Sequence, residues 1–303
     1  MSNLPTDKKI YFIIGPTGTG KSDLAIKLSK KIEKEAAAEG RRLKAEIVSA
    51  DSRQIYKDLN ISSGKITKDE MENIPHHMLD IVELGKYFSV VDFTEMALRK
   101  ISEIYERGNI PIVCGGTGLY IDHLLYNINL PKAPKNEKIR EEMRNKNANE
   151  LFEILEKLLE SNDNDNLSIL NRFSSIEFKN NKARLIRAIE IISKLGYYPE
   201  EKRERRFLNA EIMLTSLDKS TFKEKILKRT LERLRAGMLE EIIFIKNKYK
   251  LSEEYIKGLG FEYSLCLDFI NKKIDYQNFL NEFLIKEYQY AKRQITWFKK
   301  YKI

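Results

Sequence analysis

The sequence predicts an α/β fold: a parallel sheet with flanking helices, joined by a mainly helical insertion domain and a helical C-terminal part. A short apolar run, a glycine-rich loop and a helix-like stretch follow one another within residues 10–35. Strand-like and helix-like segments alternate over residues 1–120, which is the pattern of a parallel sheet. After Ser220 the pattern is helical, and no proline follows Pro199.

The first strand, loop and helix carry the strongest motif of the chain. Ile10–Ile14 is a short apolar block, typical of a buried parallel strand. From Asp23 to Glu35, apolar residues recur near helical spacing. Between them, residues 15–22 read Gly-Pro-Thr-Gly-Thr-Gly-Lys-Ser, which fits G-x-x-x-x-G-K-[ST]. The backbone N–H groups of such a loop and the helix N-terminus point at a di- or triphosphate.

This motif predicts a P-loop NTPase-like core. Lys21 would add a point charge to the phosphate site, and the Ser22 hydroxyl would hold a Mg²⁺ ion. The motif does not identify the phosphate-bearing molecule, and ATP remains one candidate. The residues expected to bind it form the whole loop: Gly15, Pro16, Thr17, Gly18, Thr19, Gly20, Lys21 and Ser22.

Two further strand ends carry polar or glycine-rich residues. Ala45–Ala50 reads as a second strand and is followed by Asp51-Ser52-Arg53-Gln54. Asp51 could hold Mg²⁺ or act as a general base on an amine, and the Gln54 amide suits the N6 and N7 atoms of adenine. A third strand, 109–114, runs into Gly115-Gly116-Thr117-Gly118. That segment is either a second close approach to the ligand or a plain strand-to-helix turn.

The composition restricts the class of protein. The chain has 303 residues, 42% hydrophobic and 33% charged, which predicts roughly two domains. No apolar stretch reaches the ~18–20 residues of a membrane span, and the first residues lack the apolar block of a signal peptide. Cys114 and Cys266 have no metal-type spacing, so neither a disulfide framework nor a zinc site is expected. We therefore expect a cytoplasmic protein without a membrane partner.

The chain changes character at two places, which predicts three segments. Residues 1–126 form the P-loop α/β core, and residues 127–200 form a helical insertion domain with an apolar stripe from Leu151 to Leu159. Residues 201–303 return to the core through a strand near Ala210–Leu217 and continue as the helical C-terminal part.

Basic residues gather in two of the predicted helical regions. The net charge is +9, and the segments 179–206 and 286–302 each carry +5. Such clusters favour a polyanion partner, although a lysine-rich surface would give the same count. In the second segment, Lys292, Thr296 and Lys299 share one helical face with Arg293 beside it. Trp297 and its neighbour Phe298 are expected to include at least one core anchor.

Taken together and in order, these motifs resemble the tRNA dimethylallyltransferases of bacterial type. These enzymes prenylate the adenosine just 3′ of the anticodon. The resemblance runs along nearly the whole chain. It rests on residues 15–22, Ser-Ala-Asp-Ser-Arg-Gln-Ile-Tyr (49–56), Ile-Pro-His-His-Met-Leu-Asp (74–80), Gly-Gly-Thr-Gly-Leu-Tyr (115–120), Arg-Leu-Ile-Arg-Ala-Ile-Glu (184–190) and Tyr-Ala-Lys-Arg-Gln-Ile-Thr-Trp-Phe (290–298).

The resemblance implies a catalytic centre. The loop would hold the pyrophosphate of dimethylallyl diphosphate, with Lys21, Ser22 and Mg²⁺ stabilising the leaving group. Asp51 would accept a hydrogen bond from adenine N6 and take its proton. Thr17 and Thr117 would line the prenyl and pyrophosphate pocket. His76 and His77 match a family motif, and we interpret them as structural.

It also implies a tRNA-binding surface for the anticodon stem-loop, on a protein expected to be a monomer. The residues that match are Asp51, Ser52, Arg53, Gln54, Thr117, Arg140, Ala183, Arg184, Arg187, Lys257, Gly260, Lys292, Arg293, Gln294, Thr296 and Trp297.

Several segments depart from the family pattern, among them Asn180-Asn181-Lys182 before the Arg184 helix and the two that follow. Gly-Thr-Ala-Lys-Pro usually follows the second motif, where this chain has Ser63-Gly64-Lys65-Ile66. The usual Ile-Gly-Tyr-Lys/Arg turn reads Leu259-Gly260-Phe261-Glu262, which loses a hydroxyl and reverses a charge. The alternatives are a prenyltransferase of free adenine nucleotides, a P-loop small-molecule kinase, and an RNA-binding NTPase without transferase activity.

Overall fold

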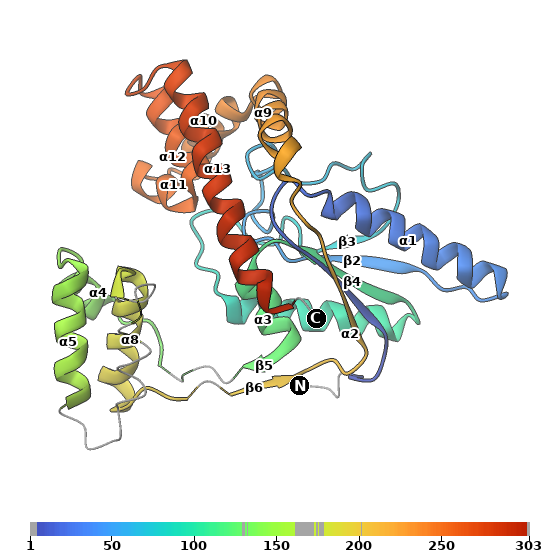
Figure 1. The fold of residues 1–303 in the computed structure, drawn as a ribbon, viewed down its shortest axis with the longest axis horizontal. Helices are drawn as coiled ribbons and strands as arrows, with labels where there is room; N and C mark the ends of the chain where they lie inside the picture. Colours follow the sequence, from blue (N-terminus) through green and yellow to red (C-terminus); the bar gives the residue numbers. More distant parts are fainter. Residues whose placement is uncertain are drawn as a thin grey trace. The chain divides into compact units, whose positions relative to one another are not determined.

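The computed structural model describes residues 5–128, 131, 133–160, 173, 175, 179–200 and 202–301. The chain divides into two compact units (Figure 1). Unit 1 contains residues 1–127 and 205–303, and unit 2 contains residues 128–204. The chain passes between them at β5 (Tyr126–Ile128) and β6 (Arg203–Arg205), which form a two-stranded sheet. The sequence predicts these boundaries after residues 126 and 200.

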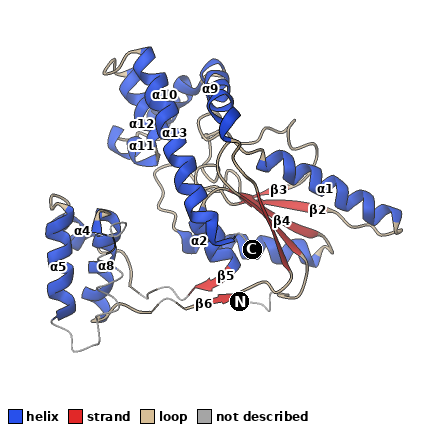
Figure 2. Cartoon of the chain, in the orientation of Figure 1, coloured by secondary structure: helices blue, strands red, loops and turns tan. Residues whose placement is uncertain are grey.

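Unit 1 is built on a five-stranded parallel sheet (Figure 2). Its strand order is β3-β2-β4-β1-β7. The register pairs Ile13 of β1 with Cys114 of β4 and with Met213 of β7. Strands that are parallel and covered by helices confirm the predicted α/β class. The strands are β1 (Ile10–Ile14), β2 (Ala45–Ser49), β3 (His76–His77), β4 (Ile110–Gly115) and β7 (Ala210–Leu214).

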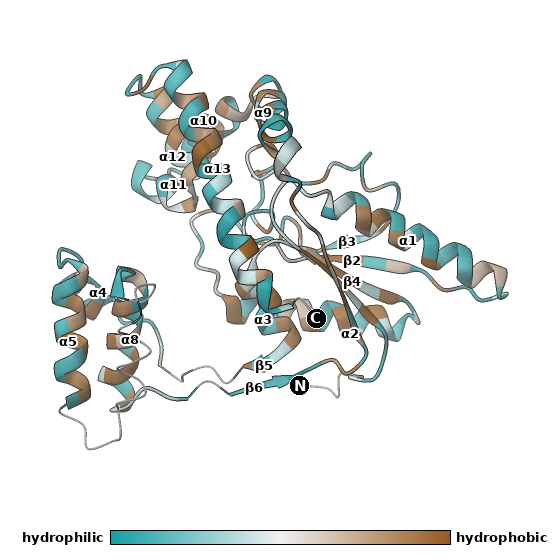
Figure 3. Cartoon of the chain, viewed as in Figure 1, coloured by the Kyte–Doolittle hydropathy of each residue, from teal (hydrophilic) through white to brown (hydrophobic). Residues whose placement is uncertain are grey.

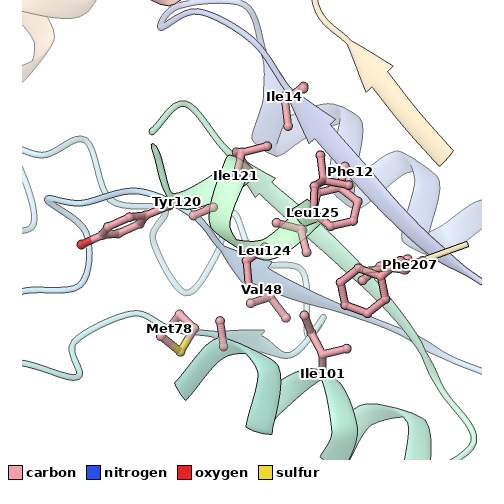
Figure 4. Packing of buried hydrophobic residues seen from close by; sticks show 14 of the residues in the cluster. Phe12, Ile14, Val48, Met78, Ile101, Tyr120, Ile121, Leu124, Leu125 and Phe207 are labelled. Carbon is pink, nitrogen blue, oxygen red and sulfur yellow. The ribbon is translucent and has the colours of Figure 1, made fainter. Parts of the chain in front are cut away.

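Three helices follow strands of this sheet: α1 (Lys21–Ala38), α2 (Val90–Glu106) and α3 (Gly118–Leu125). Ser89 caps α2 reciprocally, since its side chain accepts from the Asp92 N–H and the Asp92 carboxylate accepts from the Ser89 N–H. Figure 4 shows Ile101 of α2 and Leu124 of α3 packed with strand residues such as Val48 in one apolar cluster. Burial of these side chains is what fixes the strand ends in space.

The two histidines lie at the edge strand of this sheet. His77 Nε2 lies 2.6 Å from Glu46 Oε2, and His76 Nδ1 lies 2.8 Å from the Ile74 carbonyl oxygen. Arg107 and Asn109 also donate to the buried Glu46, and their hydrogen bonds outweigh burial and lower the pKa of Glu46 to about 2. These contacts support the structural role expected for both histidines, which stays a prediction.

The helical C-terminal part of unit 1 belongs to a second apolar cluster, which it shares with residues of the 55–84 segment. Ile242, Tyr263, Phe279 and Phe283 are buried together there. The long last helix ends against α3, where buried Asp122 accepts hydrogen bonds from Trp297 Nε1, Lys300 Nζ and the Tyr301 hydroxyl. The elements are α9 (Lys219–Arg235), α10 (Met238–Lys248), α11 (Glu253–Leu259), α12 (Phe261–Ile270), α13 (Tyr276–Phe298) and the 3-10 turn η1 (Lys299–Tyr301).

Unit 2 is helical, with α4 (Glu137–Met143), α5 (Ala148–Glu160) and α8 (Lys182–Leu195). The apolar faces of α5 and α8 meet through Leu151, Leu155, Leu185 and Ile189 (Figure 3). The stripe predicted from Leu151 to Leu159 is therefore core. Among the described residues of the whole chain, no helix is long and apolar enough to cross a bilayer.

One buried carboxylate joins two arginines in unit 2. Arg140 Nε donates to Glu190 Oε1 at 2.6 Å, and Arg187 Nη1 donates to Glu190 Oε2 at 3.1 Å. The Glu190 side chain is 0% exposed. Although burial opposes its ionisation, the hydrogen bonds from Arg140, the Asn136 N–H and Arg187 outweigh that effect and lower the pKa of Glu190.

Replacing Glu190 with Ala is expected to destabilise unit 2 by about 2–3 kcal/mol. Removing one partner of a buried pair costs ~3–5 kcal/mol, and partial exposure of both arginines reduces that figure. Because the folded pKa is depressed, the stabilisation is complete above the unfolded pKa and is lost as pH falls through the folded pKa. Thermal unfolding of the full chain at several pH values measures it, with exposed Glu153→Ala on α5 as control. Equal melting of both variants would contradict the expectation.

Candidate active site

A cavity of about 630 Å³ lies within unit 1, where the carboxyl ends of β1, β2 and β4 meet. The predicted phosphate loop contributes Thr17 to Ser22 to its wall, and Asp51, Arg53 and Gln54 face it from the end of β2. Helices α9, α12 and α13 complete the enclosure. In parallel α/β sheets, ligands bind at this edge.

The phosphate loop has the backbone that its glycines permit. Gly15 has φ +151°, and a Cβ there would lie 2.2 Å from Thr215 Oγ1 of the segment after β7. Gly20 has φ +73° and is the N-cap of α1, with no side chain that caps the helix. The first N–H groups of α1 therefore face the loop, as an anion site requires. Thr19 Oγ1 steadies the turn by donating to the Pro16 carbonyl oxygen at 2.8 Å.

Lys21 lies half-buried at the start of α1. Its Nζ donates to the Pro16 carbonyl oxygen at 2.7 Å, so the ammonium is folded back over the loop. Desolvation disfavours the charged form and lowers the pKa of Lys21 to about 8. An anion bound in the loop would reverse this effect, because a neighbouring negative charge favours the ammonium form.

Asp51 is fixed by the backbone that follows it. Its Oδ1 accepts hydrogen bonds from Arg53 N at 2.8 Å and from Gln54 N at 3.3 Å. This turn presents the carboxylate to the cavity in one orientation. The Gln54 amide, in contrast, is engaged by the protein: its Nε2 donates to the Gly64 carbonyl oxygen at 3.2 Å. The expected recognition of adenine by Gln54 stays a prediction.

Thr117 lies next to the Asp51 segment. Its Oγ1 accepts from Ser52 N at 3.0 Å, and it is the N-cap residue of α3. Neither Thr117 nor Ser52 is among the residues that line the cavity. The glycines around Thr117 are approached by side chains of α13, since a Cβ on Gly118 would lie 2.4 Å from the Trp297 ring. Gly115 and Gly116 line the cavity, whereas Gly118 packs under the last helix, so the segment both approaches the cavity and forms a strand-to-helix turn.

Gln294 of α13 connects two of these segments. Its Oε1 accepts from Thr17 N in the phosphate loop at 2.8 Å, and its Nε2 donates to the Gly116 carbonyl oxygen at 2.8 Å. Gln294 is only 7% exposed, and Trp297 is half-buried against Asp122. The sequence places both residues on the tRNA-binding surface. The structure gives them contacts inside unit 1, so a direct tRNA contact stays a prediction for each.

The other expected tRNA-binding residues fall into exposed and paired groups. Lys292, Arg293 and Thr296 are exposed on α13. Lys257 Nζ lies 2.7 Å from Asp268 Oδ1, and Gly260 separates α11 from α12. In unit 2, Arg140 and Arg187 hold Glu190, while Ala183 and Arg184 belong to the first turn of α8.

The 60–66 loop, which contributes to the cavity wall, is held in place by hydrogen bonds. A single carboxylate, Glu241 of α10, accepts from the backbone N–H groups of Asn60, Ile61 and Ser62 at 2.7–2.9 Å. Lys65 Nζ then donates to the Tyr56 carbonyl oxygen at 2.8 Å. These contacts hold the 60–66 loop, whose Ser63 and Gly64 line the cavity.

Sequence reasoning missed the charged groups that α9 brings to the site. Lys225, Arg229 and Arg233 all line the cavity, and Arg229 Nη1 donates to Thr17 Oγ1 at 3.1 Å. Their spacing of four residues places them on one helical face, and this was the signal in the sequence. Burial and the nearby Arg229 lower the pKa of Arg233 to about 10. Three cations opposite a phosphate loop suit a polyphosphate ligand.

The oxygen donors of the cavity fit a Mg²⁺ ion that binds through a ligand's phosphates. Ser22 and Asp51 face the same space, and oxygen atoms are the ligands that Mg²⁺ prefers. Among the described residues, no group of three or more His, Cys, Asp or Glu could hold a metal. The donor set therefore matches a metal shared with a phosphate, since Mg²⁺ is commonly held by one or two protein groups plus substrate oxygens.

A family model and curated relatives both match this chain over most of its length. A family model described as IPP transferase matches residues 54–301. The tRNA dimethylallyltransferase of Bacillus subtilis (strain 168) is 32% identical over 299 residues, covering 97% of this chain and 88% of that protein. The tRNA dimethylallyltransferase of Geobacillus thermodenitrificans (strain NG80-2) is 33% identical over 297 residues, covering 96% and 88%.

Solved structures of tRNA prenyltransferases also resemble this chain. The tRNA isopentenylpyrophosphate transferase of Bacillus halodurans superposes with a TM-score of 0.66 at 26% identity, covering 97% of this chain and 87% of that one. A eukaryotic dimethylallyltransferase, described as acting on tRNA, superposes with a TM-score of 0.76 at 25% identity, covering 97% and 70%.

Proposed function

The chain belongs to the IPP transferase family, and on that premise we propose that it transfers a dimethylallyl group from dimethylallyl diphosphate to tRNA, with release of pyrophosphate. The proposed acceptor atom is N6 of the adenosine just 3′ of the anticodon, at position 37. The observation that carries this proposal is that the phosphate loop and the Asp51 carboxylate face one cavity. A leaving diphosphate and an amine that must lose a proton need these two groups side by side.

The donor would bind with its diphosphate in the loop. The N–H groups at the start of α1, the Lys21 ammonium and the α9 cations surround this position. The Ser22 hydroxyl would hold Mg²⁺, which would neutralise charge on the departing pyrophosphate. Groups fixed before the reaction stabilise the developing charge without reorganising, which makes them effective catalysts.

The acceptor chemistry falls to Asp51. The lone pair of adenine N6 is delocalised into the ring, so the amine is a weak nucleophile. In the proposed step N6 bonds to C1 of the allylic group, the C1–O bond breaks, and its electron pair leaves with pyrophosphate. Asp51 takes the N6 proton through Oδ2. This oxygen accepts no hydrogen bond from the described residues, whereas Oδ1 accepts from Arg53 N and Gln54 N.

A base inside an anticodon loop reaches such a cavity only by leaving its stack. Basic residues outside the cavity would then hold the RNA through its phosphates, which position the nucleic acid without reading its sequence. Lys292 and Arg293 are exposed on α13, the helix that also supplies Gln294 to the phosphate loop. We therefore place one part of the tRNA contact on this helix.

Reversing the charge of Lys292 and Arg293 to Glu should weaken tRNA binding and flatten its salt dependence. Each phosphate that the protein no longer neutralises lowers the slope of log K against log salt by about 0.7–0.9. Filter binding of tRNA at several salt concentrations measures this slope. The matched control is Lys27→Glu with Lys34→Glu on α1, two exposed residues outside the predicted contacts. An unchanged slope in the α13 variant would place the tRNA elsewhere.

The proposed reaction is tested by a transfer assay. Radiolabelled dimethylallyl diphosphate, Mg²⁺ and unmodified tRNA are incubated with the protein, and AMP replaces tRNA in a parallel reaction. Label on tRNA supports the proposal. Label on AMP alone would move the protein to the prenyltransferases of free nucleotides. Phosphate release from ATP without any transfer of label would move it to the kinases or NTPases.

A further inference from the structure

Arg233 of α9 is a cation in the cavity wall without a partner in the described part of the chain. It is half-buried and lines the cavity, and among the described residues no hydrogen bond or ion pair reaches its guanidinium. Burial and the neighbouring charge of Arg229 lower the pKa of Arg233 only to about 10, so it is charged at neutral pH. Charges removed from water are normally paired, because their desolvation is costly. A negatively charged ligand of the cavity would supply the missing acceptors.

Gly64 makes room for this guanidinium. A Cβ on Gly64 would collide with Arg233 Nη2 and would lie 2.6 Å from Arg229 Nη2, so both guanidinium groups lie against the bare backbone of the 60–66 loop. Arg229 is one helical turn before Arg233, and its Nη1 donates to Thr17 Oγ1 of the phosphate loop at 3.1 Å. Arg233 therefore lies beside an arginine that contacts the phosphate loop.

Two departures from the family pattern border Arg233. When the segments are aligned on Lys65, the alanine of the usual Gly-Thr-Ala-Lys-Pro falls on Gly64, and the usual Lys/Arg of the later turn falls on Glu262. The Glu262 charge favours the charged form of Arg233. Burial and the charge of Glu287 raise the pKa of Glu262 to about 7, so at neutral pH Glu262 is partly protonated and does not fully neutralise Arg233. This chain therefore brings a cation to the cavity on α9, where the family pattern has one on α12.

We propose that Arg233 binds the diphosphate of the donor together with Arg229, and that Gly64 is required because a side chain there would displace the Arg233 guanidinium. The proposal rests on the proposed function, since it concerns the phosphate site of the same transfer. A guanidinium presents a planar fork of N–H groups that matches two phosphate oxygens. Its charge would hold the departing pyrophosphate from the side of α9, while the loop N–H groups and Lys21 hold it from the side of α1.

The test measures binding of the diphosphate without any transfer. Calorimetry at neutral pH with Mg²⁺ and without tRNA gives Kd for dimethylallyl diphosphate and for inorganic pyrophosphate. We expect Arg233→Met to raise both Kd values by about 10-fold or more, because hydrogen bonds between charged groups are among the strong ones. Arg233→Lys keeps the charge without the fork and should give intermediate values. Arg235→Met, the same replacement at an exposed residue of α9, should bind both ligands as the wild type does.

A second pair of variants moves the guanidinium without removing it. Gly64→Ala places a methyl group against Arg233 and Arg229 and should raise both Kd values. Gly40→Ala is the matched control, because Gly40 has a similar left-handed backbone, with φ +71° against +59°, but no atom within 4 Å of a Cβ there. In the Arg233→Met background, Gly64→Ala should raise the Kd values less than it does in the wild type. An undiminished effect in that background would overturn the role given to Gly64.

The outcomes distinguish this inference from the proposed function. Unchanged Kd values in Arg233→Met would overturn the inference, whether or not the wild type transfers label to tRNA. Raised Kd values beside a wild type that transfers no label would support Arg233 as a diphosphate-binding residue while the proposed function fails. Filter binding of tRNA without the donor tests the other source of phosphate. A loss of tRNA binding in Arg233→Met with unchanged Kd values for both diphosphates would assign Arg233 to an RNA phosphate and overturn the proposal.

Discussion

Replacing Asp51 with Ala is expected to lower kcat by roughly 10²–10⁴ while leaving the binding of the diphosphate donor largely intact. The Asp51 carboxylate, the proposed base, lines the cavity at the end of β2, and the phosphate loop keeps its backbone in the variant. Single-turnover transfer with saturating tRNA measures kcat. Calorimetry with dimethylallyl diphosphate measures binding of the donor.

Asp51→Asn is the matched control. Its amide oxygen can still accept from Arg53 N and Gln54 N, so the turn after β2 keeps its shape while the basicity is lost. Asn and Ala should therefore be similarly slow if Asp51 is the base. A fast Asn variant beside a slow Ala variant would reduce Asp51 to a residue that shapes the turn. Near-normal turnover in both would remove it from the reaction.

The second large effect is expected at Lys21. Lys21→Met should lower kcat/KM for dimethylallyl diphosphate by about 10²–10³, since removing one preorganised donor from a developing charge costs this much in other enzymes. The matched control is Lys27→Met, an exposed residue on the same helix, which should behave as wild type. Steady-state transfer at varied donor concentration measures both. Similar losses in the two variants would mean that α1, and not the Lys21 charge, is affected.

A pH profile makes the Lys21 expectation sharper. Burial lowers the pKa of Lys21 to about 8, so the free enzyme loses this charge as pH rises past that value. The donor binds the charged form, and its KM should increase with pH above about 8 in the wild type. Lys21→Met has no such group and should lack this alkaline rise. The same rise in the variant would assign it to another residue.

The first strand, the phosphate loop and the following helix could be predicted from the sequence because their chemistry is local. Ile10–Ile14 is apolar throughout, and the glycines of 15–20 allow the positive-φ backbone that a phosphate loop requires. The α/β class followed from such segments in series. The packing of α10 to α13 against one another and against the 55–84 segment could not be predicted in the same way. The apolar face of a helix shows that it is covered, but not by which partner.

The same limit explains which residues of the candidate site could be predicted from the sequence and which could not. Asp51 and Lys21 can be recognised because each follows a strand within a short motif. The resemblance assigns Gln294 to the tRNA-binding surface, yet its backbone partner in the phosphate loop is Thr17, 277 residues earlier. Glu287 was missed for the same reason, because its contact with Thr17 Oγ1 forms only where α13 meets the phosphate loop.

The distance along the chain between Thr17 and Gln294 also has a consequence for biosynthesis. Residues 15–22 leave the ribosome early, whereas the helix that holds Thr17 is made 277 residues later. At about 5–20 residues per second, the loop waits roughly 15–50 seconds for its partner. A nascent chain can fold its first strands in that interval, but it has no complete catalytic centre. Competence to modify RNA therefore arises only after translation of the last helix.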